Sequence, residues 1–166
     1  YYNQIGKSGN HQNAINGYLE LINFVDTNFG ENSILKLELL NNLGFEYSIL
    51  KDNKNALKYY LSSLKLAKKF NQKRNLVTST MNAGDIYFGT GDYKKSNEYY
   101  KQALEIIEFS SQKTQIYLYA GLSKTETILG NYDQALAYGN IGLKIAKNCH
   151  GINHPSNLQW LGSLAL

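Results

Sequence analysis

The stretch that decides the fold is NAGDIYFGTGDYKKSNEYYKQAL, residues Asn82–Leu104. Its first part has the pattern of one helix face, with Gly84 and Tyr87 three residues apart. Its last part has a second such pattern, in which Tyr100 follows Ser96 by four residues. The glycines and the aspartate between the two parts are typical of a helix end and of the cap of the next helix. The stretch therefore predicts two antiparallel helices joined by a short turn.

The glycines of this stretch also suggest a phosphate-binding loop, and the residues argue against that interpretation. Thr90 stands where the phosphate-loop motif needs a lysine, and the preceding segment is helical in pattern, whereas the motif follows a strand. A dinucleotide fingerprint fails as well, because Lys94 stands where its third glycine belongs. Nucleotide binding at this stretch is not expected.

The same pattern recurs along the chain at a nearly constant period. The segments GNHQNAINGYLELI, KDNKNALKYYLSSL, GDYKKSNEYYKQAL and GNYDQALAYGNIGL align without gaps when Ala14, Ala56, Ser96 and Ala135 are superposed. The intervals between these four residues are 42, 40 and 39 residues. From the second segment on, another helical pattern with a small residue precedes each of them, as at Gly44, Gly84 and Ser123. Repetition at this period is typical of a solenoid of helix pairs.

The sequence predicts an all-α fold, a right-handed α-solenoid of antiparallel helix pairs. The single proline of the chain, Pro155, is consistent with an almost wholly helical protein, because proline interrupts helices. The expected helices are 1–7, 11–27, 32–50, 53–70, 73–89, 93–109, 112–129, 132–148 and 156–166.

The pattern resembles the tetratricopeptide repeat (TPR) family over almost the whole chain. The segments that carry the resemblance are NNLGFEY with NALKYYLSSL and NAGDIYF with DYKKSNEYYKQAL. The family's commonest period is about 34 residues, and the longer period here is similar to that of kinesin light chain repeats and of many bacterial regulators. The entry segments NFGENSILKLELLNNLG and CHGINHPSNLQWLGSLA also resemble the kinesin light chain type.

The resemblance implies one repeat array over residues 1–166. It divides into a partial first repeat (1–27), three full repeats (32–70, 73–109 and 112–148) and the start of a fifth (156–166). Solenoids need polar capping repeats, and the chain ends with Leu164 and Leu166. We therefore expect a fragment of a longer protein, with self-association through uncapped repeat ends as a further expectation.

The composition of the chain argues against several classes of protein and partner. A net charge of +4, from 17 basic and 13 acidic residues, gives only a mild positive field. The densest basic run, from Lys65 to Arg74, is interpreted as cations near a helix C-terminus, so nucleic acid is not an expected partner. No apolar run is long enough to span a membrane. The single cysteine, Cys149, excludes an internal disulfide and favours a cytoplasmic location.

The residues give little support for catalysis or cofactor binding. Cys149, His150 and His154 offer only three metal ligands, and the favoured interpretation is a polar loop. The fold places no serine or cysteine nucleophile beside a histidine, and no pair of carboxylates stands out. We therefore expect no enzyme activity, no metal and no cofactor.

In TPR proteins the first helix of each pair lines the concave side of the solenoid, where ligands usually bind. The residues expected to bind a peptide there are Glu38, Asn41, Asn42, Phe45, Thr78, Met81, Asn82, Asp85, Phe88, Tyr117 and Lys124.

Two repeat positions in that set each have two possible interpretations. Asn42 and Asn82 share one repeat position, and the family often uses such a ladder on a peptide backbone. The alternative is that they bond to a neighbouring helix or to water. Asp85 and Lys124 also share a position, and are expected to pair across the groove or to contact a charged ligand.

Glu126 lies where tyrosine is expected to be buried, which implies either a rotated helix or an exposed carboxylate in loose packing.

The leading hypothesis is a non-catalytic interaction scaffold that binds an extended peptide or a protein partner in its groove. The alternative is a sensory or regulatory module that packs against an attached effector domain, such as a kinase, a DNA-binding domain or a caspase-like protease. A third class, an RNA or lipid binder that uses the Lys65 to Arg74 edge, predicts affinity that falls steeply with salt.

Overall fold

The structure, a computed structural model, describes residues 10–150, with side chains described through Asn148. This part of the chain is all-helical, with no strand. Its elements are α2 (His11–Phe29), α3 (Lys36–Ile49), α4 (Asn53–Lys69), α5 (Lys73–Gly89), α6 (Tyr93–Leu104), the short 3₁₀ helix η1 (Ile107–Phe109), α7 (Gln112–Ile128) and α8 (Tyr132–His150). The expected segments 1–7 and 156–166 lie outside the described residues.

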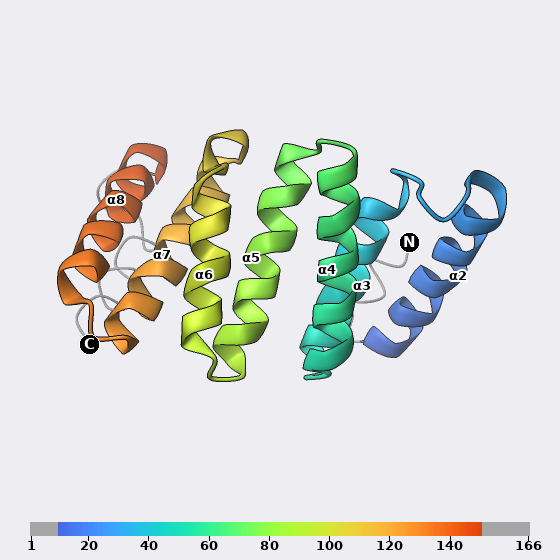
Figure 1. Cartoon of the computed structure of the whole chain (residues 1–166), viewed down its shortest axis with the longest axis horizontal. Coiled ribbons are helices and arrows are strands. Elements are labelled where there is room, and N and C mark those ends of the chain that lie inside the picture. The colour runs from blue at the N-terminus through green and yellow to red at the C-terminus, as the bar shows by residue number, and fades with distance from the viewer. Residues whose placement is uncertain (1–9, 151–166) are drawn as a thin grey trace.

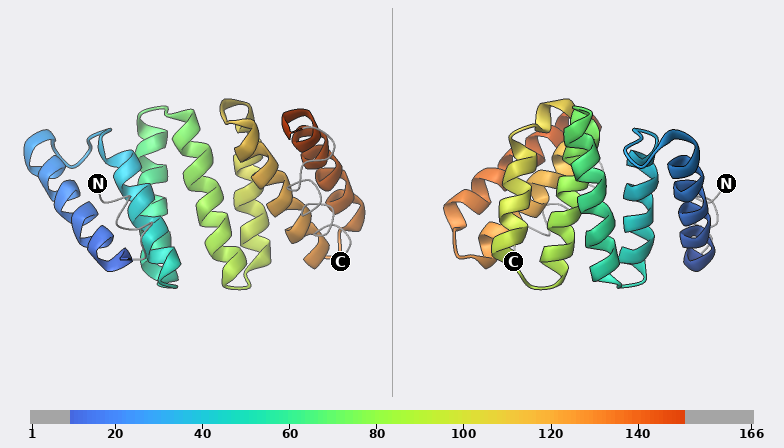
Figure 2. Two further views of the ribbon diagram at one scale, coloured as in Figure 1. Left: turned by 180° about the vertical axis from the view of Figure 1, so that it is seen from behind. Right: turned by 45° about the vertical axis from the view of Figure 1, so that its right-hand side comes forward.

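The helices stand side by side in sequence order, from α2 at one end of the row to α8 at the other (Figure 1). Each helix packs against its neighbours in the chain, and α3 also contacts α5, as α5 contacts α7. The two further views show the same single row of helix pairs (Figure 2). The predicted α-solenoid of antiparallel pairs is confirmed.

The turns inside the pairs follow one design. After α3, α5 and α7 the chain passes through a left-handed residue, at Lys51, Gly91 and Gly130, with φ of 62°, 83° and 82°. In each case a backbone N–H reaches back five residues to a helix carbonyl, as when Asp92 donates to Tyr87 over 3.0 Å. Asp52 and Asp92 then cap α4 and α6 by accepting from backbone N–H groups three residues on.

Two predicted helix bounds were wrong. α3 begins at Lys36 and not at residue 32, because a turn follows α2, in which Leu35 N–H donates to the Ser33 hydroxyl. α6 ends at Leu104 and does not continue to 109, since Ile106 has a non-helical φ of −127°. That break lets Ile106 and its neighbour Ile107 pack against the core between α5 and α7.

The core is a series of clusters between successive helices. We call the first helix of each pair (α3, α5 and α7) the inner helix and the second (α4, α6 and α8) the outer helix. Small residues on the inner helices let them approach the outer ones. A Cβ on Gly44 would lie 2.8 Å from the ring of Tyr60, and one on Gly84 would lie 2.8 Å from the ring of Tyr100. Tyr100 also touches Gly121 of α7 on its other side, so one aromatic ring fills the space between two inner helices. This packing fixes which sides of α3, α5 and α7 remain open.

Candidate functional site: the open face of α3, α5 and α7

The inner helices are joined directly by a side-chain hydrogen bond. The Asn82 Nδ2 of α5 donates to the Asn41 Oδ1 of α3 over 2.9 Å. This bond links the two residues 41 positions apart and establishes how the helices are turned toward each other.

Helix geometry converts this bond into the direction of the open face. Each residue is turned by about 100° from the previous one. Measured from the small residue that packs on the outer helix (Gly44 or Gly84), Asn41 points at about 60° and Asn82 at about 160°. Asn41 marks the side of an inner helix that faces the next inner helix, and Asn82 marks the side that faces the previous one. The open side of each inner helix lies midway between these two directions. That direction is occupied by the residue after the small one, at about 100°, and by the sixth residue before it, at about 120°.

Six of the predicted binding residues occupy these two positions, and all six are at least partly accessible. They form two rows across the three helices. We define the Phe45 row as Phe45, Asp85 and Lys124, and the Tyr117 row as Glu38, Thr78 and Tyr117. Phe45 is 51% exposed and Tyr117 is 65% exposed, which is unusual for large aromatic side chains. We call the surface made by the two rows the inner face.

Met81 was wrongly expected on this face. It is 6% exposed and belongs to the core cluster that contains Tyr100 and Leu122. Its position, three residues before Gly84, turns it toward α7 and away from the open side. Phe88 is also not fully open on this face. It is half-buried, and its ring packs edge-on against the ring of Tyr93 at a centroid distance of 5.4 Å.

The asparagines contact neighbouring helices, which is the alternative interpretation of the ladder. Asn82 bonds to Asn41. Burial and the Glu46 charge raise the pKa of Tyr18 on α2, and the nearby Asn42 side chain opposes part of that rise. At the next equivalent position Gly121 packs on the Tyr100 ring. These residues therefore hold adjacent repeats together, and their direct contact with a peptide remains a prediction.

Asp85 is the central polar group of the inner face. Its side chain is exposed, and its Oδ1 accepts a hydrogen bond of 2.5 Å from the Tyr100 hydroxyl. The surrounding protein shields the carboxyl from water, which raises its pKa, and the bond from Tyr100 opposes only part of that rise. The pKa of Tyr100 is also raised, by burial and by the Asp85 charge.

Asp85 and Lys124 do not pair with each other. Within residues 10–148 the ion pairs are Lys36 with Asp26, Lys95 with Asp92, and Lys101 with Glu126, and the His11 ring contacts the Glu46 carboxylate. Of the two expectations for Asp85 and Lys124, pairing across the groove is therefore wrong. Contact with a charged ligand remains a prediction.

A cluster of polar side chains surrounds one buried carboxylate, Glu126, on the side of the repeats away from the inner face. This cluster was not predicted from the sequence. Glu126 of α7 is 1% exposed and receives hydrogen bonds from Lys101 Nζ at 2.8 Å, Asn97 Nδ2 at 3.0 Å and Asn131 Nδ2 at 2.7 Å. Burial alone would raise its pKa, but these hydrogen bonds and the Lys101 charge lower it. Both expectations for Glu126 were wrong, because the helix keeps its register and the carboxylate is buried with polar partners.

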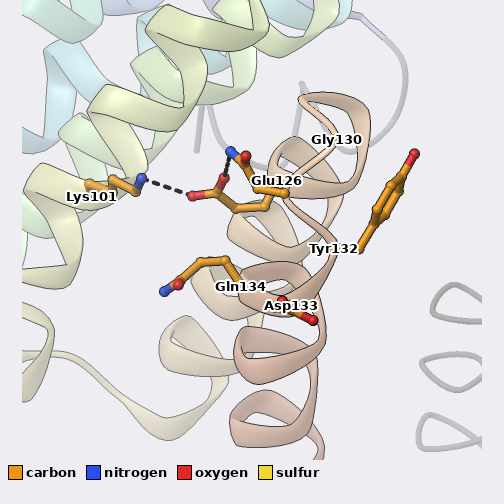
Figure 3. A pocket seen from close by; sticks show the side chains of 7 residues that line it. Lys101, Glu126, Gly130, Tyr132, Asp133 and Gln134 are labelled. Carbon is orange, nitrogen blue, oxygen red and sulfur yellow. Dashed lines mark hydrogen bonds and ion pairs between the residues drawn. The ribbon is translucent and has the colours of Figure 1, made fainter.

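This cluster borders an open pocket of about 690 Å³ (Figure 3). The pocket is lined by Lys101, Glu126, Gly130, Asn131, Tyr132, Asp133 and Gln134. The close-up shows that the Lys101 amine and the Glu126 carboxylate, which both line this pocket, are turned toward each other. Since these polar groups satisfy one another, we interpret the cluster as a joint between α6, α7 and α8.

Two further properties concern the described residues alone. Residues 10–148 contain no group of three histidine, cysteine or acidic side chains placed to hold a metal ion. The side chains of Cys149 and His150, and all of His154, lie outside that part. None of the described helices is long and apolar enough to cross a membrane.

Comparisons with known proteins agree with the fold. Residues 41–108 match the family model described as "Tetratricopeptide repeat". Response regulator aspartate phosphatase I of Bacillus subtilis (strain 168) is 34% identical over 91 residues, which cover 55% of this chain and 23% of that protein. The chain thus spans about a quarter of the length of this curated relative.

Several solved structures have the same fold. BtubC (BKLC) from P. vanneervenii has a TM-score of 0.83 at 18% identity, covering 93% of this chain and 63% of its own. A putative kinesin light chain from Podosopora anserina has a TM-score of 0.80 at 14% identity, covering 99% and 80%. The apo form of RapI has a TM-score of 0.72 at 24% identity, covering 90% and 53%. Residues 41–108 are therefore tetratricopeptide repeats, and the described chain as a whole folds as a tetratricopeptide repeat solenoid.

Proposed function

We propose that this chain is a non-catalytic interaction module that holds an extended peptide or a segment of a protein partner on its inner face. The observation that carries the proposal is the composition of that face. It presents two large aromatic side chains, Phe45 and Tyr117, beside charged side chains that have no ion-pair partner among the described residues. Aromatic and charged groups left open together are typical of protein interaction surfaces.

The comparisons support an interaction role in a coarser way. The TPR fold is generally a non-catalytic scaffold, and the name of the Bacillus subtilis relative describes action on a response regulator, which is itself a protein. We therefore propose a protein or peptide partner, with no nucleic acid, membrane or cofactor. The proposed location is the cytoplasm, as the single cysteine favours.

The experiment compares capture of partners by variants of the inner face with capture by a matched control. Phe45→Ala combined with Tyr117→Ala removes both exposed aromatics, and Tyr132→Ala removes an aromatic that is 69% exposed at the start of α8. Each purified protein is immobilised, and binders are selected from a random peptide library. We expect the double variant to lose the selected peptides and Tyr132→Ala to retain them, with equal helicity by circular dichroism. Equal retention by the double variant and the control would contradict the proposal.

A second candidate is a regulatory module that packs against an attached effector domain. The observation that favours it is exposed apolar surface at both ends of the row: Leu21 and Phe24 on α2, and Leu136 and Ile141 on α8. Such surface is also where copies of the module could self-associate. In the intact protein, hydrogen exchange of α2 and α8 should be slower than in the isolated chain at a concentration where both are monomeric. Equal exchange would exclude packing of an effector on these ends.

A further inference from the structure

We infer that the partner is an extended segment that lies across α3, α5 and α7 and contacts the Phe45 row with every third residue: an apolar side chain at Phe45, a basic one at Asp85 and an acidic one at Lys124. This inference rests on the proposed function and adds the chemistry and spacing of the partner. It follows from the order of the three side chains in the Phe45 row and from the spacing of the helices that carry them.

The spacing argument begins with the three helices. Phe45, Asp85 and Lys124 each follow the small residue of their helix, so they occupy one level of the solenoid. Contacting helices lie about 8–10 Å apart, and α3 contacts α5, as α5 contacts α7. A polyproline-type segment advances about 9.3 Å in three residues and returns the same side to the surface at each third residue. One contact for each helix therefore matches residues i, i+3 and i+6 of such a segment.

Other backbone conformations fit this spacing less well. A β-strand turns the same side to the surface every second residue, which is about 6.6 Å and falls short of the helix separation. An α-helix needs seven residues to advance about 10.5 Å and return to the same side. A helical partner would therefore need about 15 residues to reach all three positions.

The charge argument concerns which group each position accepts. Tyr100 occupies the Oδ1 atom of Asp85 and leaves Oδ2 open, and Asp85 has no cationic partner among residues 10–148. Glu38 of the neighbouring row adds a second exposed negative charge toward the α3 side. Lys124 is exposed and likewise without an ion pair in the described chain. The inner face is thus acidic over α3 and α5 and basic over α7, and a complementary segment has the opposite order.

Phe45 supplies the apolar contact. It is 51% exposed beside the asparagine bond that joins α3 and α5. Its position makes it the end of the row farthest from Lys124. An aliphatic or aromatic side chain of the partner would cover its ring and remove both surfaces from water.

The test is a selection from a phage-displayed library of random 16-residue peptides, which is long enough for helical as well as extended binders. The immobilised chain is used as wild type, as Asp85→Asn, and as the charge exchange Asp85→Lys with Lys124→Asp. Asp85→Asn keeps the oxygen that accepts from Tyr100 and removes only the charge. Glu98→Gln, which removes an exposed carboxylate from α6, is the matched control.

The wild type and Glu98→Gln should select the pattern apolar-x-x-basic-x-x-acidic, in either chain direction. The charge exchange should select the two charges in exchanged places. Asp85→Asn should lose the preference for a basic residue and bind the wild-type consensus peptide about tenfold more weakly in fluorescence polarisation, the effect of one charge-assisted contact of about 1.4 kcal/mol.

The outcomes separate the inference from the proposed function. Binders that depend on Phe45 and Tyr117 but show no charge order, or a seven-residue spacing, would overturn the inference and leave the proposed function standing. A library that yields no binder dependent on the inner face would overturn both. Selection of exchanged charges by the charge exchange variant would support both.

Discussion

At the scale of single residues, the ring of Tyr100 controls how closely two repeats approach. It packs on Gly84 from one side and Gly121 from the other, where added Cβ atoms would lie 2.8 and 2.9 Å from its carbon atoms. Its hydroxyl, at the end of the same ring, holds Asp85 on the inner face. One side chain therefore determines both the packing of α5, α6 and α7 and the position of the central carboxylate.

We predict that Gly84→Ala destabilises the protein by about 2 kcal/mol, because the new methyl group overlaps a ring that is fixed on both sides. Gly89→Ala is the control, since a Cβ there meets nothing within 4 Å and alanine favours the helix. The free energy of unfolding from urea titrations measures both changes. Equal effects of the two substitutions would show that the small residue at Gly84 is not required for packing.

Asp85 should cost stability at neutral pH. Its folded pKa is raised above the unfolded value, so its contribution is most favourable below the unfolded pKa of about 4 and is lost as pH rises through the folded pKa. Asp85→Asn keeps the bond from Tyr100 and should raise the free energy of unfolding at pH 7 by less than about 1 kcal/mol, because solvent partly screens the charge. Chemical unfolding of both proteins at pH 7 and pH 3 measures the difference. A gain that is larger at pH 3 would contradict this prediction.

At the scale of helices, the ends of α3, α5 and α7 show one backbone design carried by different residues. Lys51 adopts φ of 62° where the other two turns have Gly91 and Gly130. A side chain in this region is unfavourable by about 1 kcal/mol relative to glycine. The same turn is therefore less stable after α3 than after α5 or α7.

Lys51→Gly should accordingly stabilise the protein by about 1 kcal/mol without changing its helicity. The reciprocal change, Gly91→Ala, places a side chain at φ of 83° and should destabilise it by a similar amount. Thermal unfolding followed by circular dichroism measures the two shifts. If Lys51→Gly lowers the melting temperature, the gain in flexibility of the unfolded chain outweighs the relief at the turn.

The joint around Glu126 binds α6, α7 and α8 through charge, and its strength should depend on pH. Because the folded pKa of Glu126 is lowered, its contribution is present above the unfolded value of about 4.5 and is lost as pH falls through the folded pKa. Glu126→Gln should destabilise the protein by about 2 kcal/mol at pH 7, and by less at pH 3. Unfolding of both proteins at the two pH values measures this, with the exposed Glu98→Gln as control.

The order and type of the helices could be predicted from the sequence because each repeat has the same small and large residues at fixed places. The bounds failed where a local turn competes with the helix, as before Lys36, or where core packing interrupts it, as at Ile106. The residues expected on the inner face lie on α3, α5 and α7, but not all of them lie on the open side of these helices. Met81 shows why: the side of a helix that faces its neighbour depends on the angle between the helices, which a single sequence does not contain.

At the scale of the whole molecule, the fold has no single centre. Each cluster of the core lies between successive helices, so each repeat depends on the next one for the burial of its apolar face. The inner face spans three repeats, and its shape therefore depends on the joints between them. One joint is the Asn41 to Asn82 bond, and the other is the Tyr100 ring between Gly84 and Gly121.

This arrangement predicts a gradient of local stability along the solenoid. Among the described helices, α3 to α7 are each packed between two chain neighbours, while α2 packs chiefly against α3 and α8 against α7. Backbone amides of α4 to α6 should exchange with deuterium most slowly, because these helices lie farthest from the two ends of the row and opening them breaks two interfaces. Amides of α2 should exchange fastest. Hydrogen exchange measured by mass spectrometry tests this on the unmodified chain. In Asn82→Ala the slow region should contract to α5 and α6, since the hydrogen bond between α3 and α5 is lost while the Tyr100 joint remains. Uniform exchange across all helices, in both proteins, would instead indicate that the repeats open as one cooperative unit.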